Sequence, residues 1–206
     1  MARPRRLVVG ISGASGAIYG IRLLEMLRRI GGIESHLVMS TAAERTICEE
    51  TSWRLADVRA LADVNHALRN VGASIASGSF RAIGMVVAPC SVRSLSSIAY
   101  CQADNLLSRA ADVTLKEGRP LILLLRETPL HAGHIKAMAA ACDSGAVIMP
   151  PVPAFYNRPS TIDDIVDHTM ARVLDRLGIE HHLAPRWCEG PAATGLATPA
   201  SDGDLA

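Results

Sequence analysis

Short continuous apolar runs along the chain alternate with stretches of helical periodicity. Leu7–Ile11 is an apolar run, and 17–30 follows with Ile21, Leu24 and Leu27 at near-helical spacing. The alternation continues and predicts further strands at 36–39, 85–88, 121–125 and 146–149, and helices at 41–51, 92–100, 105–116, 129–144 and 161–177. Continuous apolar strands separated by helices are typical of a parallel sheet covered on both faces, so we expect an α/β domain.

Four features interrupt or end this pattern. Pro89 is expected to end the third strand, and 57–78 is the least regular segment, which predicts a long excursion near the functional site. Thr161 and Asp164 approximate a capping box at the start of the last helix. The small and acidic residues of 189–206 offer nothing to bury, so we expect a folded domain over 1–188 and a mobile tail.

Composition narrows the classes of protein. The chain has 206 residues, of which 49% are apolar and 20% charged, and this composition excludes wholesale disorder. A net charge of +1 argues against a nucleic-acid partner, and the longest aliphatic runs span one strand rather than a membrane. Five cysteines without a CxxC pair suit free thiols, which predicts a cytoplasmic location.

The first predicted strand ends in the glycine-rich segment Gly10–Gly16. Ligands of parallel sheets bind at the carboxyl ends of strands, and glycines let backbone N–H groups approach an anion there. A plain tight turn is the alternative. The spacing is GxxGxxG rather than the dinucleotide GxGxxG, and the second strand ends at Ser40 where a nicotinamide enzyme usually has an acid. Both departures favour a mononucleotide over NAD.

The third and fourth strands lead into further polar residues. Ser91–Ser94 offers hydroxyls and N–H groups at a helix start, which fits either an anion site or an ordinary N-cap. Cys90 is expected to be a buried thiol rather than a nucleophile. Arg126 and Glu127 follow the strand 121–125, at the edge where the sheet opens.

Further cations and aromatic residues have two interpretations each. Arg109 and Lys116 are two turns apart on one helix face, so with Arg126 they could bind a phosphate dianion or could simply be solvated. Tyr156 lies in a Pro-rich loop, where its ring could belong to the core or to a lid over the site. Arg172 flanks the apolar face of the last helix, where spacing does not distinguish it from Arg176.

Taken in order, these motifs resemble one known family. The chain is similar to the UbiX/Pad1 flavin prenyltransferases over about residues 6–188, through Gly13-Ala-Ser-Gly16, Leu37-Val-Met-Ser40, Pro89-Cys-Ser91, Arg109-Ala-Ala-Asp-Val with Lys116-Glu, Arg126-Glu127, Phe155-Tyr156 and Arg186-Trp187. The resemblance implies a three-layer Rossmann- or flavodoxin-like parallel sheet in a single domain. It also implies a homo-dodecamer whose active sites lie at subunit junctions.

The resemblance further implies a reaction. Family members join dimethylallyl monophosphate to N5 and C6 of reduced FMN without a metal, and the prenylated FMN serves a UbiD-type decarboxylase. By the same resemblance the FMN-binding residues are Gly13, Ala14, Ser15, Ser40, Ser91, Val92, Arg93, Ser94 and Arg126. The donor-binding residues are Arg109, Lys116, Glu127, Tyr156 and Arg172, and the catalytic residues are Ser15, Glu50, Lys116, Glu127 and Trp187.

The chain departs from the family pattern at two adjacent FMN-binding positions, and other functions remain open. Val92-Arg93 stands where many members have Thr-Gly, a change that preserves backbone contacts but not a hydroxyl contact. A non-catalytic FMN-binding subunit of a hydroxyaryl acid decarboxylase is the main alternative. A flavin-dependent cysteine decarboxylase of the same fold is weaker, because Met149-Pro-Pro-Val-Pro lacks the asparagine of that class. The monophosphate and the diphosphate donor are both compatible with these residues.

Overall fold

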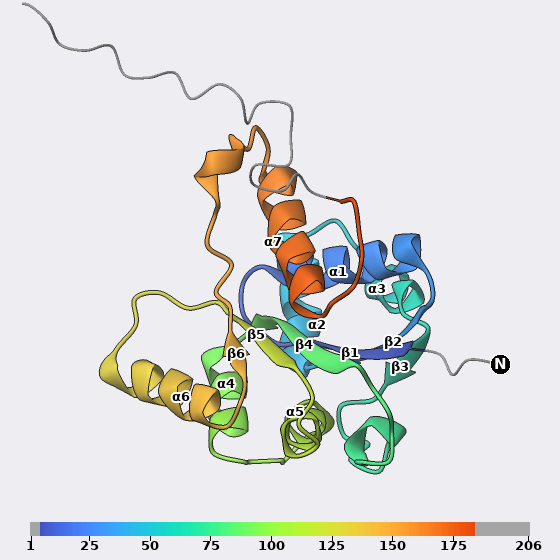
Figure 1. Cartoon of the computed structure of the whole chain (residues 1–206), viewed down its shortest axis with the longest axis vertical. Helices are drawn as coiled ribbons and strands as arrows, with labels where there is room; N and C mark the ends of the chain where they lie inside the picture. Colours follow the sequence, from blue (N-terminus) through green and yellow to red (C-terminus); the bar gives the residue numbers. More distant parts are fainter. Residues whose placement is uncertain (1–4, 184–206) are drawn as a thin grey trace, which may run out of the picture.

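The computed structural model describes residues 5–183, which form a parallel sheet between two layers of helices (Figure 1). The strands are β1 (Arg5–Ile11), β2 (Ile33–Met39), β3 (Val64–His66), β4 (Gly84–Cys90), β5 (Leu121–Leu125) and β6 (Val147–Ile148). The helices are α1 (Ala17–Ile30), α2 (Thr41–Glu50), α3 (Leu55–Leu61), α4 (Val92–Ala99), α5 (Leu106–Lys116), α6 (Ala132–Asp143) and α7 (Ile162–Arg176), with 3₁₀ turns η1 (Ser74–Ala76) and η2 (Phe155–Asn157).

The strand order places the reversal of the sheet between β1 and β4. The order is β3-β2-β1-β4-β5-β6, and every pair is parallel. From β1 the chain adds β2 and β3 on one side, then returns to β4 on the other. Ligands of such sheets bind beyond the carboxyl ends of the two strands that flank the reversal.

Successive residues of β1, β2, β4 and β5 mostly belong to opposite cores. Val9 packs with α1, α2, α3 and α7, whereas its neighbour Val8 packs with α4, α5 and α6. Figure 1 shows these helix groups on the two sides of the sheet. Both side chains are nearly inaccessible to solvent, which explains why the strands are continuous apolar runs rather than alternating ones. The single-domain, three-layer α/β architecture is therefore confirmed.

The structure differs from the sequence predictions in the irregular segment 57–78 and at the end of β4. The irregular segment contains most of α3, together with β3 and η1, all of which the periodicity missed. β3 is a three-residue edge strand, Val64–His66, without an apolar run. Pro89 does not end β4, which continues to Cys90. Proline is tolerated there because the pairing with β5 shifts register between Val87 and Cys90.

The predicted capping box at the start of α7 is present. The Thr161 hydroxyl accepts from the Asp164 N–H at 3.1 Å, and the Asp164 carboxylate accepts from the Thr161 N–H at 2.9 Å. Hydrogen bonds from the backbone and hydroxyl of Ser160 and from Thr161 lower the pKa of Asp164 to about 2. Across residues 5–183 no helix is long and apolar enough to cross a membrane.

Candidate functional site

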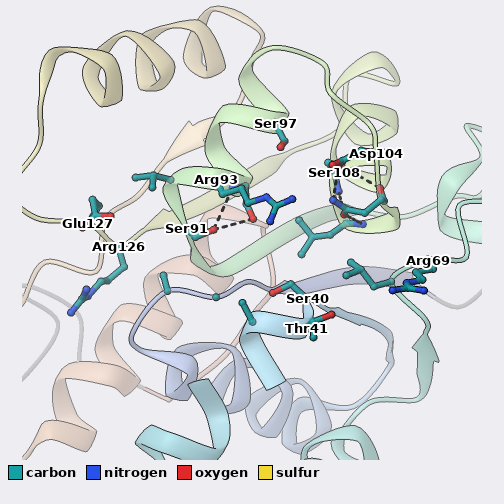
Figure 2. A pocket seen from close by; sticks show the side chains of 18 of the residues that line it. Ser40, Thr41, Arg69, Ser91, Arg93, Ser97, Asp104, Ser108, Arg126 and Glu127 are labelled. Atoms are coloured by element: carbon teal, nitrogen blue, oxygen red, sulfur yellow. Dashed lines mark hydrogen bonds between the residues drawn. The ribbon is translucent and has the colours of Figure 1, made fainter. Parts of the chain in front are cut away.

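A cavity of about 810 Å³ opens at the carboxyl edge of the sheet, where the strand order reverses (Figure 2). Its size is that of an ordinary cofactor cleft. Most of the residues that line the cavity have polar side chains. The lining includes Gly13, Ala14, Ser15, Ser40, Thr41, Arg69, Ser91, Val92, Arg93, Ser94, Ser97, Asp104, Asn105, Ser108, Arg126 and Glu127. The structure thus brings together, from four separate loops, all the residues that the family resemblance assigns to FMN.

The buried hydroxyl of Ser12 joins the two strands beneath this cavity. Its Oγ donates to the Pro89 carbonyl at 2.9 Å and accepts from the Ser91 N–H at 2.8 Å. The Ser12 N–H also donates to the Pro89 carbonyl. Ser12 is fully buried. It therefore fixes the glycine-rich turn against the start of α4, a positioning role that the sequence patterns did not indicate.

The glycine-rich turn is tight for two different reasons. Gly16 has a φ of 95°, in the left-handed region that favours glycine. Gly13 has no such angle, but a Cβ there would lie 2.2 Å from the Cβ of Ala42 at the start of α2. The absence of a side chain at Gly13 therefore allows the first two loops of the site to touch.

Glu50 occupies the N-terminus of α1. Its Oε2 accepts from the Gly16 N–H at 2.7 Å and from the Ala17 N–H at 3.3 Å. A carboxylate is stabilised there by the free N–H groups and the helix dipole. In the isolated chain these two N–H groups are therefore occupied by a side chain and are not open to a phosphate.

The starts of α2 and α4 remain open to a ligand. Ser40 caps α2 by accepting from Ala43, and Ser91 caps α4 by accepting from Ser94. Among residues 5–183, nothing accepts the backbone N–H groups at the first two positions of these helices, which are Thr41, Ala42, Val92 and Arg93. Free N–H groups at two helix starts suit an anion or the polar edge of a ring.

Arg126 and Glu127 complete one end of the cavity. The Arg126 N–H donates to the Cys90 carbonyl at 3.0 Å, which continues the pairing of β4 with β5 and carries the side chain to the rim. Glu127 accepts from the Thr128 N–H through its carboxylate. Cys90 itself is fully buried, which confirms the prediction of a buried thiol, and burial raises the pKa of this thiol to about 12.

Sequence reasoning missed the opposite end of the cavity. Asn105 caps α5 by accepting from the N–H groups of Leu107 and Ser108, and Asp104 accepts from the Ser108 hydroxyl at 3.3 Å. Arg69 approaches from the loop between β3 and η1. An asparagine before a helix is a readable capping signal, whereas no local pattern places Arg69, because the fold alone brings that loop to the site.

The remaining predicted donor-binding residues do not line this cavity. Arg109 pairs with Asp112 at 2.7 Å, Lys116 with Glu117 at 2.5 Å, and Arg172 with Asp175 at 2.6 Å. The Tyr156 hydroxyl lies 3.1 Å from the His168 ring nitrogen. The helix α5 carries Arg109 and Lys116 on one face of the sheet, and α7 carries Arg172 on the other (Figure 1). The expected convergence of these cations with Arg126 is therefore absent from the described part of one chain.

Two of the predicted features cannot be located in the structure. Trp187 and the tail 189–206 lie outside the described residues. Within residues 5–183, no group of three histidine, cysteine or acidic side chains is placed to hold a metal ion.

Comparison with known proteins agrees with this geometry. A family model described as Flavoprotein matches residues 1–174. A flavin prenyltransferase UbiX from Escherichia coli K12 is 57% identical over 185 residues, covering 89% of this chain and 98% of that protein. The chain belongs to the UbiX flavin prenyltransferase family. The residues that the UbiX resemblance assigns to FMN are among those that line the cavity described above.

Solved structures of UbiX proteins share the fold. The crystal structure of AnUbiX (PadA1) with FMN and dimethylallyl pyrophosphate is 48% identical, covers 90% of this chain and 98% of that one, and has a TM-score of 0.88. A dodecameric FMN-dependent UbiX-like decarboxylase from Escherichia coli O157:H7 is 51% identical, covers 88% and 98% of the two chains, and has a TM-score of 0.86.

Proposed function

We propose that this protein transfers the dimethylallyl group of dimethylallyl monophosphate to N5 and C6 of reduced FMN. The observation that carries the proposal is the cavity at the sheet reversal, lined by Gly13–Ser15, Ser40, Ser91–Ser94 and Arg126. Family membership at 57% identity, and a relative that binds FMN with a prenyl donor, support the same reaction.

The cavity suits a flavin mononucleotide. Free N–H groups of α2 and α4 and the Arg126 guanidinium supply donors for phosphate and for the carbonyl edge of a ring, while Ser40 and Ser91 offer hydroxyls. Reduced FMN supplies the electron-rich N5 and C6 atoms that accept the prenyl group. The chain's own part is to bind and orient this ring beside Glu127.

We further propose that neighbouring copies complete the donor site. Arg109, Lys116 and Arg172 project from opposite helix layers, so one chain cannot surround a single phosphate with all three. Phe155 is 73% exposed and Ile162 78%, and burial against another copy would remove this apolar surface from water. The dodecamer of a 51% identical relative supports such an assembly.

The proposed roles follow from charge. Fixed cations stabilise negative charge as it develops on the departing phosphate, the role that a metal ion has in many prenyl transfers. In the assembled site Lys116, Arg109 and Arg172 would exchange their present carboxylate partners for this phosphate. Glu127 and Glu50 are carboxylates suited to moving protons near the flavin. The family resemblance adds Ser15 and Trp187 to the proposed catalytic residues.

The deciding experiment is anaerobic incubation of the protein with reduced FMN and either dimethylallyl monophosphate or the diphosphate, followed by mass spectrometry of the flavin. We expect a mass increase of one prenyl group with the monophosphate, and the same yield when a chelator is present. Product with the diphosphate alone would reverse the proposed donor preference. An unchanged flavin mass with both donors would refute the enzyme assignment and favour the non-catalytic subunit.

Variants separate flavin binding from turnover. Lys116→Ala and Glu127→Gln are expected to lower turnover by at least about 100-fold while FMN still binds. Lys136, the only other lysine, lies on α6 and is exposed, so Lys136→Ala is a matched control that keeps full activity. Equal activity of the Lys116 and Lys136 variants would contradict the donor-site assignment.

The biological setting is also part of the proposal. The prenylated flavin would be handed to a UbiD-type decarboxylase, and five cysteines without a CxxC pair suit a cytoplasmic enzyme. Adding the product of the flavin reaction to an apo-decarboxylase of that type, then measuring CO₂ release, tests the first point. Release that needs both the protein and the prenyl donor is the expected result.

A further inference from the structure

The end of the cavity that lies away from Glu127 carries two arginines to which the family resemblance gives no side-chain role. Arg93 lies in the first turn of α4, and Arg69 in the loop between β3 and η1. Both line the cavity and both side chains are exposed. In Figure 2 Arg69 lies on the same side of the cavity as Asp104 and Ser108, Arg126 and Glu127 lie on the other side, and Arg93 is between them.

Neither guanidinium is neutralised by the rest of the described chain. Many of the other arginines pair with a carboxylate, as Arg109 does with Asp112 and Arg172 with Asp175. The guanidinium groups of Arg69 and Arg93 form no ion pair or hydrogen bond within residues 5–183, although the Arg69 carbonyl accepts from the Val71 N–H. Two cations left unpaired in one cavity indicate a site for an anion rather than a contribution to stability.

The charge balance distinguishes the two ends. Arg126 and Glu127 offset each other at one end, whereas the rest of the lining holds Arg69 and Arg93 against the single acid Asp104. The Asp104 carboxylate is already engaged, because it accepts from the Asn105 side chain at 2.7 Å and from the Ser108 hydroxyl. The free N–H groups that begin α4 add positive potential beside Arg93. A phosphate dianion is therefore most favourable at this end.

We propose that Arg69 and Arg93 bind the phosphate of the flavin mononucleotide and make the site selective for FMN over riboflavin. This inference rests on the proposed function, because it takes FMN as the ligand. It also orients the ligand, with its phosphate at the Arg69 end and its ring toward Glu127. The role of Arg93 would then reside in its side chain, at a position where many relatives have glycine.

The test compares FMN with riboflavin on the full-length assembled protein. Arg69→Gln and Arg93→Gln are each expected to weaken FMN binding about tenfold or more, since each loses a charge-assisted hydrogen bond, and to leave riboflavin affinity within about twofold. Arg81→Gln is the matched control, because Arg81 is exposed, unpaired within residues 5–183 and near the start of β4, at the opposite edge of the sheet. Fluorescence titration gives the affinities, and melting temperatures check the fold.

Each outcome decides a separate point. Equal loss of FMN and riboflavin affinity, or no loss of either, would overturn the inference. Variants that keep FMN affinity but lose inhibition by inorganic phosphate would assign the arginines to free phosphate and also overturn it. Wild-type protein that binds FMN without prenylating it refutes the proposed function alone. Prenylation accompanied by unchanged FMN affinity in the arginine variants refutes this inference alone.

Discussion

Replacing Gly13 with alanine tests how the first two loops of the site are held together. The added Cβ would lie 2.2 Å from the Ala42 Cβ, and ordinary contact begins at 3.4 Å, so the loops must separate by about 1.2 Å. Gly13 has no left-handed backbone angle, so this collision alone opposes the substitution. Overpacking of this kind costs about 1–3 kcal/mol. Gly13→Ala should therefore lower the free energy of unfolding by that amount and weaken FMN binding, because the cavity wall moves.

A second substitution removes the other half of the collision. Without the Ala42 Cβ, the nearest atoms to a Cβ at Gly13 are the Ala42 Cα and carbonyl carbon at 3.2 Å, which a shift of a few tenths of an ångström relieves. Ala42→Gly alone should cost at most about 1 kcal/mol, because Ala42 is exposed near the start of α2. The double variant should regain stability and FMN affinity relative to Gly13→Ala. Urea denaturation and FMN titration measure both, and strictly additive losses would refute the steric explanation.

Three shorter predictions follow from the same structure. Ser12→Ala removes the acceptor for the partly buried Ser91 N–H, so urea denaturation should show a loss of about 1–3 kcal/mol; a loss under 0.5 kcal/mol would contradict this role. Iodoacetamide should leave Cys90 unmodified in the native protein and label it only in denaturant, as peptide mass mapping would reveal. Burial and the neighbouring His36 lower the pKa of His66 below its ordinary 6.5, so protonation favours the unfolded state and stability should fall as pH drops below about 6.5. His66→Gln should flatten this pH dependence in thermal melts, and an unchanged slope would argue against it.

The hydrophobic pattern was sufficient for most of the fold. Strands buried on both faces must be apolar throughout, and β1, β4 and β5 are read directly from that requirement. The capping box of α7 was equally visible, because its residues are neighbours in sequence. β3 was missed because an edge strand of three partly exposed residues needs no apolar run, and its place in the sheet depends on pairing with β2.

The residues that line the cavity from the strand ends could also be predicted from the sequence, because the carboxyl ends of parallel strands lie at one edge of the sheet. Gly13, Ser40, Ser91 and Arg126 each follow a strand and therefore meet in one cavity. Arg69 and Ser12 were invisible to this reasoning. Arg69 reaches the site on a long loop, and the importance of Ser12 arises from two partners 77 and 79 residues away.

The sequence by itself determined the parallel α/β sheet, the edge at which ligands bind and the kinds of side chain that gather there. These follow from burial and from the geometry of strands, which act residue by residue. Tertiary structure alone decided that Glu50 fills the N-terminus of α1, that Gly13 must touch Ala42, and that the cations of α5 and α7 lie on opposite faces of the sheet. Such contacts depend on how distant segments are oriented in space, and spacing along the chain does not encode that orientation.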